Sequence, residues 1–297
     1  MGYYDIYYRA EVRSVSRLSP NMLRVRFGGG DLASWASTGR GDERLVIVFP
    51  RAGDTEPPAP DRHPDGTHDY LDEATRPEMR SYTVRAWDPR TSEMLIDFVA
   101  HEGGVAVPWV RSARPGHTVF LTEAAGWYDP PADARWQLLL ADMTALPALG
   151  RILAQLPADQ QAHVIAEVIE PGDEQTLTST AHVQTRWLHG SGHGRSPSRL
   201  LAALQDFDWP DGPGYVWFAG EAGESRAVRK HLRRQLGWSA DRYAILGYWR
   251  VHGQDWNRRY EAIAPRLEHV YTQAVAEGLS STDALELYDD ALEEVGL

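Results

Sequence analysis

The stretch WQLLLADMTALPALGRILAQL, residues 136–156, marks a change in the pattern of the chain. Its first six residues form an almost wholly apolar run with the length of a buried strand. From Leu146 onward, apolar residues recur at helical spacing, at Leu149, Ile152, Leu153 and Leu156. A buried strand followed by an amphipathic helix is typical of α/β domains, in which helices cover a parallel sheet.

The same alternation continues downstream. Further apolar strands and amphipathic helices are expected, in chain order, at 163–169, 198–207, 215–220, 224–237 and 243–249. Gly237 closes the second of these helices, and HGSGHGRSPS at 189–198 is typical of a loop. The basic string RAVRKHLRR, 226–234, spreads its charges around its helix, so we expect a solvated face rather than a docking patch.

Upstream of residue 136 the chain contains short strands separated by turns. Strand patterns occur at 11–19, 22–30, 44–50, 80–87, 94–101 and 117–123. Little helical periodicity accompanies them, which favours an antiparallel barrel or sandwich. The polar, proline-rich segment 51–79 is expected to be a long surface loop.

We therefore divide the chain into a β domain (1–130), an α/β domain (131–253) and a helical extension (254–297). The extension has an apolar helical stripe from Tyr260 to Ala274. Gly278 interrupts it, and Ser280 with Asp283 resembles a capping box. We expect this extension to pack on the α/β domain or on a partner subunit.

Composition excludes several kinds of chemistry. The chain has no cysteine, so disulfides, thiolate nucleophiles and ordinary iron–sulfur clusters are excluded. Lys230 is its single lysine, which leaves no Walker A lysine and makes a pyridoxal Schiff base improbable. A net charge of −12 argues against nucleic acid as a partner. We find no signal peptide or membrane span and expect a cytoplasmic protein.

The string RPEMRSYTVRAW, 76–87, carries the first candidate site. In a strand, Arg80 and Tyr82 project on one face and Thr83 on the other. A guanidinium beside an aromatic ring suits a ligand with a phosphate and a flat ring. The alternative is an ordinary sheet face on which arginine stacks on tyrosine.

Two glycines follow a second strand with polar positions. Asp97 and His101 share a face of that strand, and Gly103 and Gly104 precede a possible short helix around 106–109. Glycines and a helix N-terminus suit the approach of an anion such as a pyrophosphate. The alternative is a glycine turn in a barrel. The histidines at 182, 189 and 193 fit a flexible loop better than a metal site, so no metal is expected.

The chain resembles the siderophore-interacting proteins, flavin-dependent ferric-siderophore reductases of the ferredoxin-reductase-like superfamily. The resemblance extends over residues 10–253 and includes RSYTVR, IDFVAH, ARPGHTVFL, ADMTALPALGRIL, YVWFAGEAGESRAVRKHL and LGYWRVHG. It implies an N-terminal antiparallel Greek-key β-barrel that binds FAD, followed by a parallel α/β nucleotide-binding domain.

The resemblance also implies site residues. Arg80 would neutralise the FAD phosphates, Tyr82 would stack on the isoalloxazine, and Thr83 would bond near the reactive ring nitrogen. The other implied FAD residues are Ser81, Asp97, Val99, His101, Gly104, Val105, Ala106, Val107, Trp109 and Thr144. Gly220, Glu221 and Trp249 are implied for the nicotinamide nucleotide, and Arg44 and Arg250 for the substrate. The electron step itself needs no acid–base residue, so none is named as catalytic.

Several positions depart from the family pattern. Val46 and Ala125 stand where basic pocket residues are usual, and Met143 where glutamate is usual. We therefore expect a neutral or cationic hydroxamate complex rather than an anionic catecholate. Gly190 replaces a frequent arginine, so the resemblance does not extend to recognition of the NADPH 2′-phosphate.

The sequence thus predicts a monomer or homodimer that reduces ferric siderophores with FAD and either NADH, NADPH or an external reductant such as ferredoxin. Two alternatives remain at this point. One is a flavin-dependent oxidoreductase with a quinone, flavin or secondary-metabolite acceptor. The other is a siderophore-binding protein without turnover.

Overall fold

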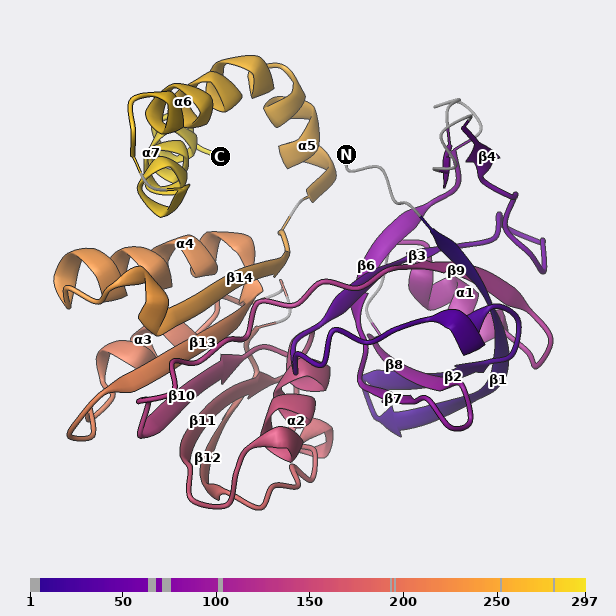
Figure 1. The fold of residues 1–297 in the computed structure, drawn as a ribbon, viewed down its shortest axis with the longest axis horizontal. Coiled ribbons are helices and arrows are strands. Elements are labelled where there is room, and N and C mark those ends of the chain that lie inside the picture. The colour runs from indigo at the N-terminus through magenta and orange to yellow at the C-terminus, as the bar shows by residue number, and fades with distance from the viewer. Residues whose placement is uncertain are drawn as a thin grey trace.

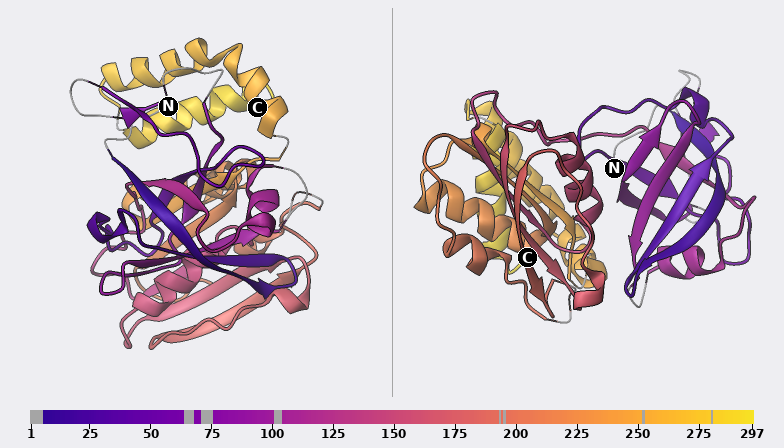
Figure 2. Two further views of the ribbon diagram at one scale, coloured as in Figure 1. Left: turned by 90° about the vertical axis from the view of Figure 1, so that its right-hand side faces the viewer. Right: turned by 90° about the horizontal axis from the view of Figure 1, so that it is seen from below.

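A computed structural model describes residues 6–63, 68–70, 76–100, 104–192, 194, 196–251, 253–279 and 281–297. Figure 1 shows a β-barrel and an α/β domain lying side by side, with three C-terminal helices beyond the α/β domain. The second view of Figure 2 shows the same arrangement of the two sheet domains from below. The fold predicted from the sequence is confirmed.

Seven antiparallel strands form the N-terminal sheet, in the order β6-β3-β9-β1-β2-β8-β7. Their bounds are β1 Tyr7–Ser19, β2 Met22–Gly28, β3 Arg44–Val48, β6 Met79–Thr83, β7 Ala86–Asp88, β8 Glu93–Val99 and β9 Thr118–Thr122. Strand β6, at one edge, also contacts β8, which brings the ends of the sheet together as a barrel. A single-turn helix, η1 (Leu32–Ser34), and helix α1 (Ala106–Ser112) interrupt the series.

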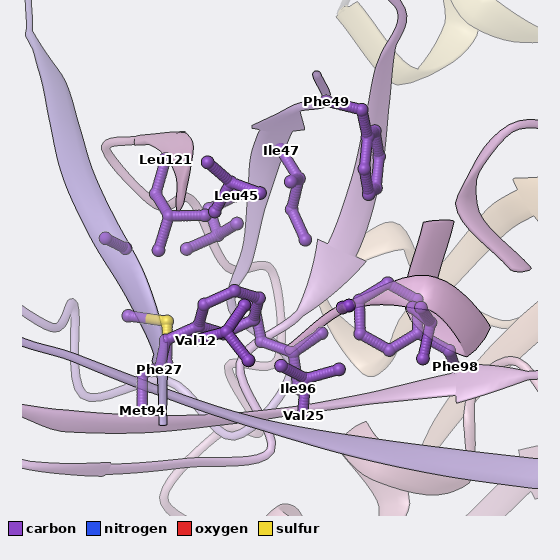
Figure 3. Close-up of a cluster of buried hydrophobic side chains, with 14 of the residues drawn as sticks. Val12, Val25, Phe27, Leu45, Ile47, Phe49, Met94, Ile96, Phe98 and Leu121 are labelled. Atoms are coloured by element: carbon purple, nitrogen blue, oxygen red, sulfur yellow. The ribbon is translucent and has the colours of Figure 1, made fainter. Parts of the chain in front are cut away.

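The barrel has an apolar interior because alternate residues of each strand point inward. Val12, Val25, Phe27, Ile47 and Ile96 are fully buried there. Figure 3 shows these side chains meeting from different strands, with Phe49 and Phe98 at one end of the cluster. Segment 51–79 was expected to be loop, but its described part contains two short paired strands, β4 (Asp61–Arg62) and β5 (His68–Asp69).

The second sheet is parallel, with the strand order β12-β11-β10-β13-β14. Its strands are β10 Trp136–Ala141, β11 Gln161–Val168, β12 His182–His189, β13 Gly214–Glu221 and β14 Tyr243–Trp249. Helix α2 (Leu146–Gln155) packs with one face, while α3 (Leu200–Gln205) and α4 (Ala222–Lys230) pack with the other. Strand β12 was not predicted, because most of its side chains are exposed and it lacks an apolar run.

The helix predicted at 224–237 begins slightly earlier than expected, at Ala222, and changes its type before it ends. Helix α4 passes into a π-helical turn, η3 (His231–Gln235), and Gly237 then ends it with a φ of 71°, as predicted. Two single-turn 3-10 helices, η2 (Pro171–Asp173) and η4 (Ala240–Arg242), complete the domain.

Helices α5 (Gly253–Glu261), α6 (Ala264–Ala276) and α7 (Ser281–Glu294) form the C-terminal extension. They share a small apolar cluster around Leu267 and Leu292. In the described part of the chain, no helix combines the length and apolarity needed to cross a membrane.

The prediction of a solvated basic face on α4 was wrong. Arg229 forms an ion pair with Asp289 on α7, and both side chains are mostly buried. Arg234 pairs with Asp290, and Arg226 donates to the carbonyl of Leu297. The basic segment is therefore the docking face for the extension of the same chain, which confirms the predicted packing of the extension on the α/β domain.

A buried ion pair joins the two sheet domains. Glu43, which directly precedes β3, is fully buried, and its Oε1 lies 2.6 Å from Nη1 of Arg151 on α2. The same Arg151 nitrogen donates to the carbonyl of Val84 at 2.8 Å. The Thr38 hydroxyl and backbone N–H donate to the other Glu43 oxygen. Because these hydrogen bonds compensate the buried charges, the pair can hold α2 against the ends of β3 and β6.

Two further buried carboxylates join the domains. Asp42 accepts hydrogen bonds from the backbone of Trp127 and Tyr128 and from the indole of Trp217 on β13. On the other side, Asp173 accepts from the hydroxyl of Ser19 and from the backbone and side chain of Asn21. Both carboxylates are fully buried, so the contact between the domains is specific rather than merely apolar.

We predict that Arg151→Met lowers the free energy of unfolding by about 3 kcal/mol, because it leaves the Glu43 carboxylate buried without its counter-charge. Urea denaturation measures the loss. The double variant Glu43→Gln/Arg151→Met recovers most of it, since no unpaired charge remains. As a control, Arg26→Met breaks an exposed pair with Glu93 and costs less than about 1 kcal/mol. An Arg151→Met loss no larger than this control contradicts the assignment.

Candidate functional site

Strand β6 presents two different faces, as the sequence predicts. Its register pairs Tyr82 with Leu45 and Thr83 with Arg44. Residues paired across antiparallel strands share a face. Arg80 and Tyr82 therefore lie on the face of the buried Leu45, and Ser81 and Thr83 lie on the face of Arg44.

The ring of Tyr82 packs at the end of the barrel core. Its centroid lies 4.4 Å from that of Phe98 and 6.2 Å from that of Phe49. Burial raises the pKa of Tyr82 above its ordinary value, which keeps the phenol neutral. Arg80 on the same face is exposed and forms a 2.7 Å ion pair with the exposed Glu78. An exposed pair of this kind contributes little stability, so the guanidinium is available to an anionic ligand.

The opposite face of β6 lies toward the α/β domain, where Arg44 of β3 contacts Tyr248. The guanidinium of Arg44 lies between two rings, 4.7 Å from the centroid of Trp127 and 4.4 Å from that of Tyr248 on β14. Arg44 Nε is buried without a hydrogen-bond partner, while the hydroxyls of Thr83 and Tyr248 lie close enough to interact with each other across the two domains. An unpaired buried polar group costs about 1–3 kcal/mol, so this junction of polar groups is a candidate place for a polar ligand.

Strand β8 contributes less directly than expected. Both Asp97 oxygens accept hydrogen bonds from the guanidinium of Arg24 on β2, at 2.6 and 2.7 Å. Val99, at the end of β8, is half-buried against the cluster shared with the α/β domain. His101 lies outside the described residues.

The predicted short helix after the glycines is α1. Gly104 has a φ of 74°, a left-handed conformation that favours glycine. Val105 leads into the first turn, where Ala106 and Val107 are buried. Trp109 packs between Phe27 and Phe49 in the barrel core, so its role is to anchor the helix.

A second candidate site lies along the carboxyl ends of the parallel strands. A cavity of about 380 Å³ lies there, lined by residues that include Asp142, Glu167, Glu221 and Trp249. These residues come from the ends of four strands on both sides of the point where the strand order reverses. Open α/β sheets bind nucleotides at this position.

Several of the residues predicted at this edge of the sheet contact the same carboxylate, that of Asp142. Asp142 accepts hydrogen bonds from the backbone and hydroxyl of Thr144, at 2.8 and 2.6 Å, and from the indole of Trp249 at 2.5 Å. A Cβ at Gly220 would lie 3.1 Å from this carboxylate. Glu221 caps α4 by accepting from the backbone of Glu224. The structure therefore brings Thr144, Gly220, Glu221 and Trp249 together.

Comparison with known proteins agrees with this geometry. Residues 11–127 match the siderophore-interacting FAD-binding domain, and residues 134–252 match the siderophore-interacting protein family. The chain belongs to the siderophore-interacting protein family. Its N-terminal barrel is that family's FAD-binding domain.

Individual relatives are similar along most of their length. Ferric vibriobactin reductase ViuB of Vibrio cholerae is 28% identical over 239 residues, covering 78% of this chain and 85% of ViuB. The NADPH-dependent ferric-chelate reductase of Escherichia coli is 27% identical over 249 residues, covering 80% and 91% of the two chains. The crystal structure of a siderophore utilization protein from T. fusca has 30% identity and a TM-score of 0.74, covering 84% of this chain and 95% of that one.

The two arginines predicted for the substrate do not form the accessible basic pocket that the family pattern implies. Arg44 is held between aromatic rings. Arg250 stacks on Trp256 of α5, 3.8 Å from the ring centroid, and burial lowers its pKa. Ala125 is exposed beside Arg44, with which it forms a β-bridge. Val46 is half-buried on the same face of β3.

Sequence reasoning missed several polar residues. Asp142 and Glu167 were not predicted, although each is a charged residue at the end of an apolar strand, which is a usable signal. Glu43, Arg24 and Arg151 were also missed. Their partners lie far away in the sequence, so no local pattern could reveal them.

Asp142 gives this edge a measurable pH dependence. Burial raises its pKa to about 6, against the opposing effect of its hydrogen bonds with Thr144 and Trp249. The folded state therefore keeps a proton that the unfolded chain releases at lower pH. The stability that Asp142 contributes is complete below its unfolded pKa and is lost as the pH rises through about 6.

We predict that the unfolding free energy of the wild type, minus that of Asp142→Asn, falls by about 3 kcal/mol between about pH 4 and about pH 7. Urea denaturation at intermediate pH values measures the difference, in which the other titrating groups largely cancel. A difference that stays constant over this range would show that Asp142 ionises as it does in water.

Proposed function

We propose that this protein is an FAD-dependent reductase of ferric siderophores that takes its electrons from a reduced nicotinamide nucleotide. The observation that carries the proposal is the junction at which Arg44 of the barrel meets Tyr248 of the α/β domain. On the barrel side lie the β6 motif and the buried Arg44 Nε, which has no hydrogen-bond partner. On the other side lies the carboxyl edge of a parallel sheet. The names of the relatives from Vibrio cholerae and Escherichia coli support the same reaction.

The residues present fit a flavin dinucleotide. Arg80 can offer its guanidinium to the phosphates, because its ion pair with Glu78 is exposed. Tyr82 offers a neutral ring fixed against Phe98, and Thr83 offers a buried hydroxyl on the opposite face of the strand. Ser81 lies beside Val46 on the Thr83 face of β6.

The remaining proposed FAD residues follow β8 and the glycines. Gly104, Val105, Ala106 and Val107 would present backbone N–H groups to the pyrophosphate. Trp109 would hold α1 against the barrel. Asp97 would act indirectly, by holding the guanidinium of Arg24 in place. Val99 and His101 would line the cofactor. Thr144 would contact it from the α/β domain.

Bound FAD would supply the conversion of a two-electron donor into single electrons for Fe(III). The chain must hold the donor, the flavin and the ferric complex close together and exclude water. Gly220, Glu221 and Trp249 would hold the donor at the sheet edge. Each hydride supplies electrons for two ferric ions. The resulting Fe(II) binds hard oxygen ligands less tightly, which releases the iron.

We further propose that the preferred substrate is a neutral or cationic hydroxamate complex. An anionic catecholate complex needs several accessible positive charges. Val46 and Ala125 supply none, the Arg44 cation is covered by Trp127 and Tyr248, and Arg250 is covered by Trp256. The flat rings beside Arg44 instead offer an apolar surface to the ligand shell.

We predict that Arg80→Ala and Tyr82→Ala each weaken FAD binding by about tenfold, through loss of a charge-assisted hydrogen bond and of ring stacking respectively. The ratio of flavin to protein absorbance after gel filtration, followed by titration of the apoprotein with FAD, measures the loss.

Two matched variants serve as controls. Tyr82→Phe keeps the ring and Arg90→Ala removes an exposed arginine paired with Asp88, so both retain FAD like the wild type. Because Arg80 is exposed, its removal leaves no cavity that could unfold the barrel. Wild-type FAD affinity in both alanine variants would remove these side chains from the cofactor site.

A further inference from the structure

One arginine at the contact between the two domains has no partner for its charge. Arg85 follows Thr83 by two residues, and its backbone N–H donates to the carbonyl of Leu95 on β8 at 2.9 Å. Its side chain is half-buried, and its Nε is buried without a hydrogen-bond partner. Among the described residues, no carboxylate or carbonyl accepts a hydrogen bond from this guanidinium. A buried cation is costly without a partner, so this group indicates an anion that is supplied by a ligand.

The carboxylates around Arg85 are already engaged by other arginines. Asp97, whose charge acts on Arg85, binds the guanidinium of Arg24 with both of its oxygens. Glu43 is engaged by Arg151 in the same way. Burial lowers the pKa of Arg85, against the effect of Asp97, and the guanidinium groups of Arg24 and Arg151 lower it further. Because arginine nevertheless keeps its proton, Arg85 adds a positive charge to this region that no carboxylate compensates.

Helix α2 leaves room for the Arg85 guanidinium. A Cβ at Gly150 would lie 3.2 Å from Nη2 of Arg85, 3.3 Å from its Cζ and 3.4 Å from its Nε. These nearly equal distances place the plane of the guanidinium face-on against Gly150. The N–H groups lie in that plane, so they point along the surface of the helix and can donate to a ligand. Glycine inside a helix costs about 0.5–1 kcal/mol relative to alanine, and this contact explains its presence.

The neighbours of Arg85 select the part of the ligand that it meets. Thr83 is proposed above to bond near the reactive nitrogen of the flavin ring, and Asp97 is a further proposed FAD residue. Asp97 lies two residues after Leu95, which accepts from the backbone of Arg85. The FAD phosphates are instead assigned to Arg80, near the start of β6 and on its other face. Arg85 therefore belongs with the ring rather than with the phosphates.

The flavin ring acquires a negative charge when it is reduced. Two electrons and one proton, which binds at N5, leave this charge spread over N1 and the C2 carbonyl. A cation near N1 is one of the means by which a protein tunes a flavin. It favours the reduced form over the oxidised form, because only the reduced ring is charged.

We propose that Arg85 stabilises the reduced, anionic flavin by donating hydrogen bonds to its N1–C2 carbonyl edge, and thereby raises the redox potential of the bound FAD. The proposal rests on the function proposed above, because it assigns a residue that tunes the same flavin. A raised potential makes the flavin easier for the electron donor to reduce.

The midpoint potential of bound FAD tests the proposal without turnover. Arg85→Met keeps the length of the stem and removes the charge. It is expected to weaken the binding of reduced FAD relative to oxidised FAD by about tenfold, the value of a charge-assisted hydrogen bond. For a two-electron couple, this lowers the potential by about 30 mV. Arg85→Lys keeps the charge and is expected to keep most of the potential.

A matched control assigns the effect to one side chain. Arg80→Met removes the same charge from the proposed phosphate contact, so it is expected to weaken the binding of both redox states equally and to leave the potential unchanged. A potential that falls equally in Arg80→Met and Arg85→Met would assign the effect to the general charge of the barrel and overturn the proposal. Urea denaturation of the apoproteins tests a purely structural role. Lower stability of Arg85→Met with a wild-type potential also overturns the proposal.

If Arg85→Met does not retain FAD, the pH dependence of the wild-type potential tests the same contact. At mildly acid pH, where free reduced flavin is protonated at N1, the bound flavin is expected to take up one proton with two electrons. Its potential then changes with pH half as steeply as that of free FAD, and equal slopes overturn the proposal.

Reduction of ferric complexes by chemically reduced holoprotein separates this proposal from the proposed function. If ferric complexes are reduced but the potential does not respond to Arg85→Met, the role of Arg85 alone fails. If the potential responds but no ferric complex is reduced, the proposed function fails.

Discussion

The buried ion pair between Glu43 and Arg151 is the contact on which the site depends. Glu43 directly precedes Arg44, and Arg151 also binds the carbonyl of Val84, the residue after Thr83. One guanidinium on α2 thus contacts the start of β3 and the end of β6, the two barrel strands that carry Arg44 and Thr83. Asp42 holds the same region to β13 through Trp217. Such pairs specify one orientation of the two domains better than apolar packing alone, because in other orientations the charges would be buried without a partner.

This fixed orientation explains how two incomplete half-sites work together. The barrel supplies Arg80, Tyr82 and Thr83 at the edge of its core. The α/β domain supplies the carboxylate edge and Trp249, but no described phosphate-binding arginine in its cavity. Electron transfer from a nucleotide through a flavin to iron requires both halves at a constant separation. The C-terminal extension, held to α4 by Arg229 and Asp289, completes the outer side of the α/β domain.

The sequence predicted what depends on local pattern. Alternation in the strands, the apolar runs of the parallel sheet and the glycine at 237 were sufficient for both domains and most of their elements. The facing of Tyr82 and Thr83 followed from strand periodicity. Strand β12 was missed because it is an exposed edge strand without an apolar run. The pairing of α4 with α7 and the links from Asp97 to Arg24 depend on contacts between distant residues, which no local pattern contains.

We expect flavin bound at the junction of the two domains to pass electrons to a ferric siderophore, and this transfer is the core of the proposed function. It is tested most directly by mixing anaerobically reduced holoprotein with a ferric hydroxamate, a ferric catecholate and a quinone, and following the flavin spectrum together with Fe(II) captured by a chromogenic chelator. We expect the hydroxamate complex to reoxidise the flavin and release Fe(II), and to do so faster than the catecholate. A flavin that stays reduced with both ferric complexes, but is reoxidised by the quinone, would contradict the account.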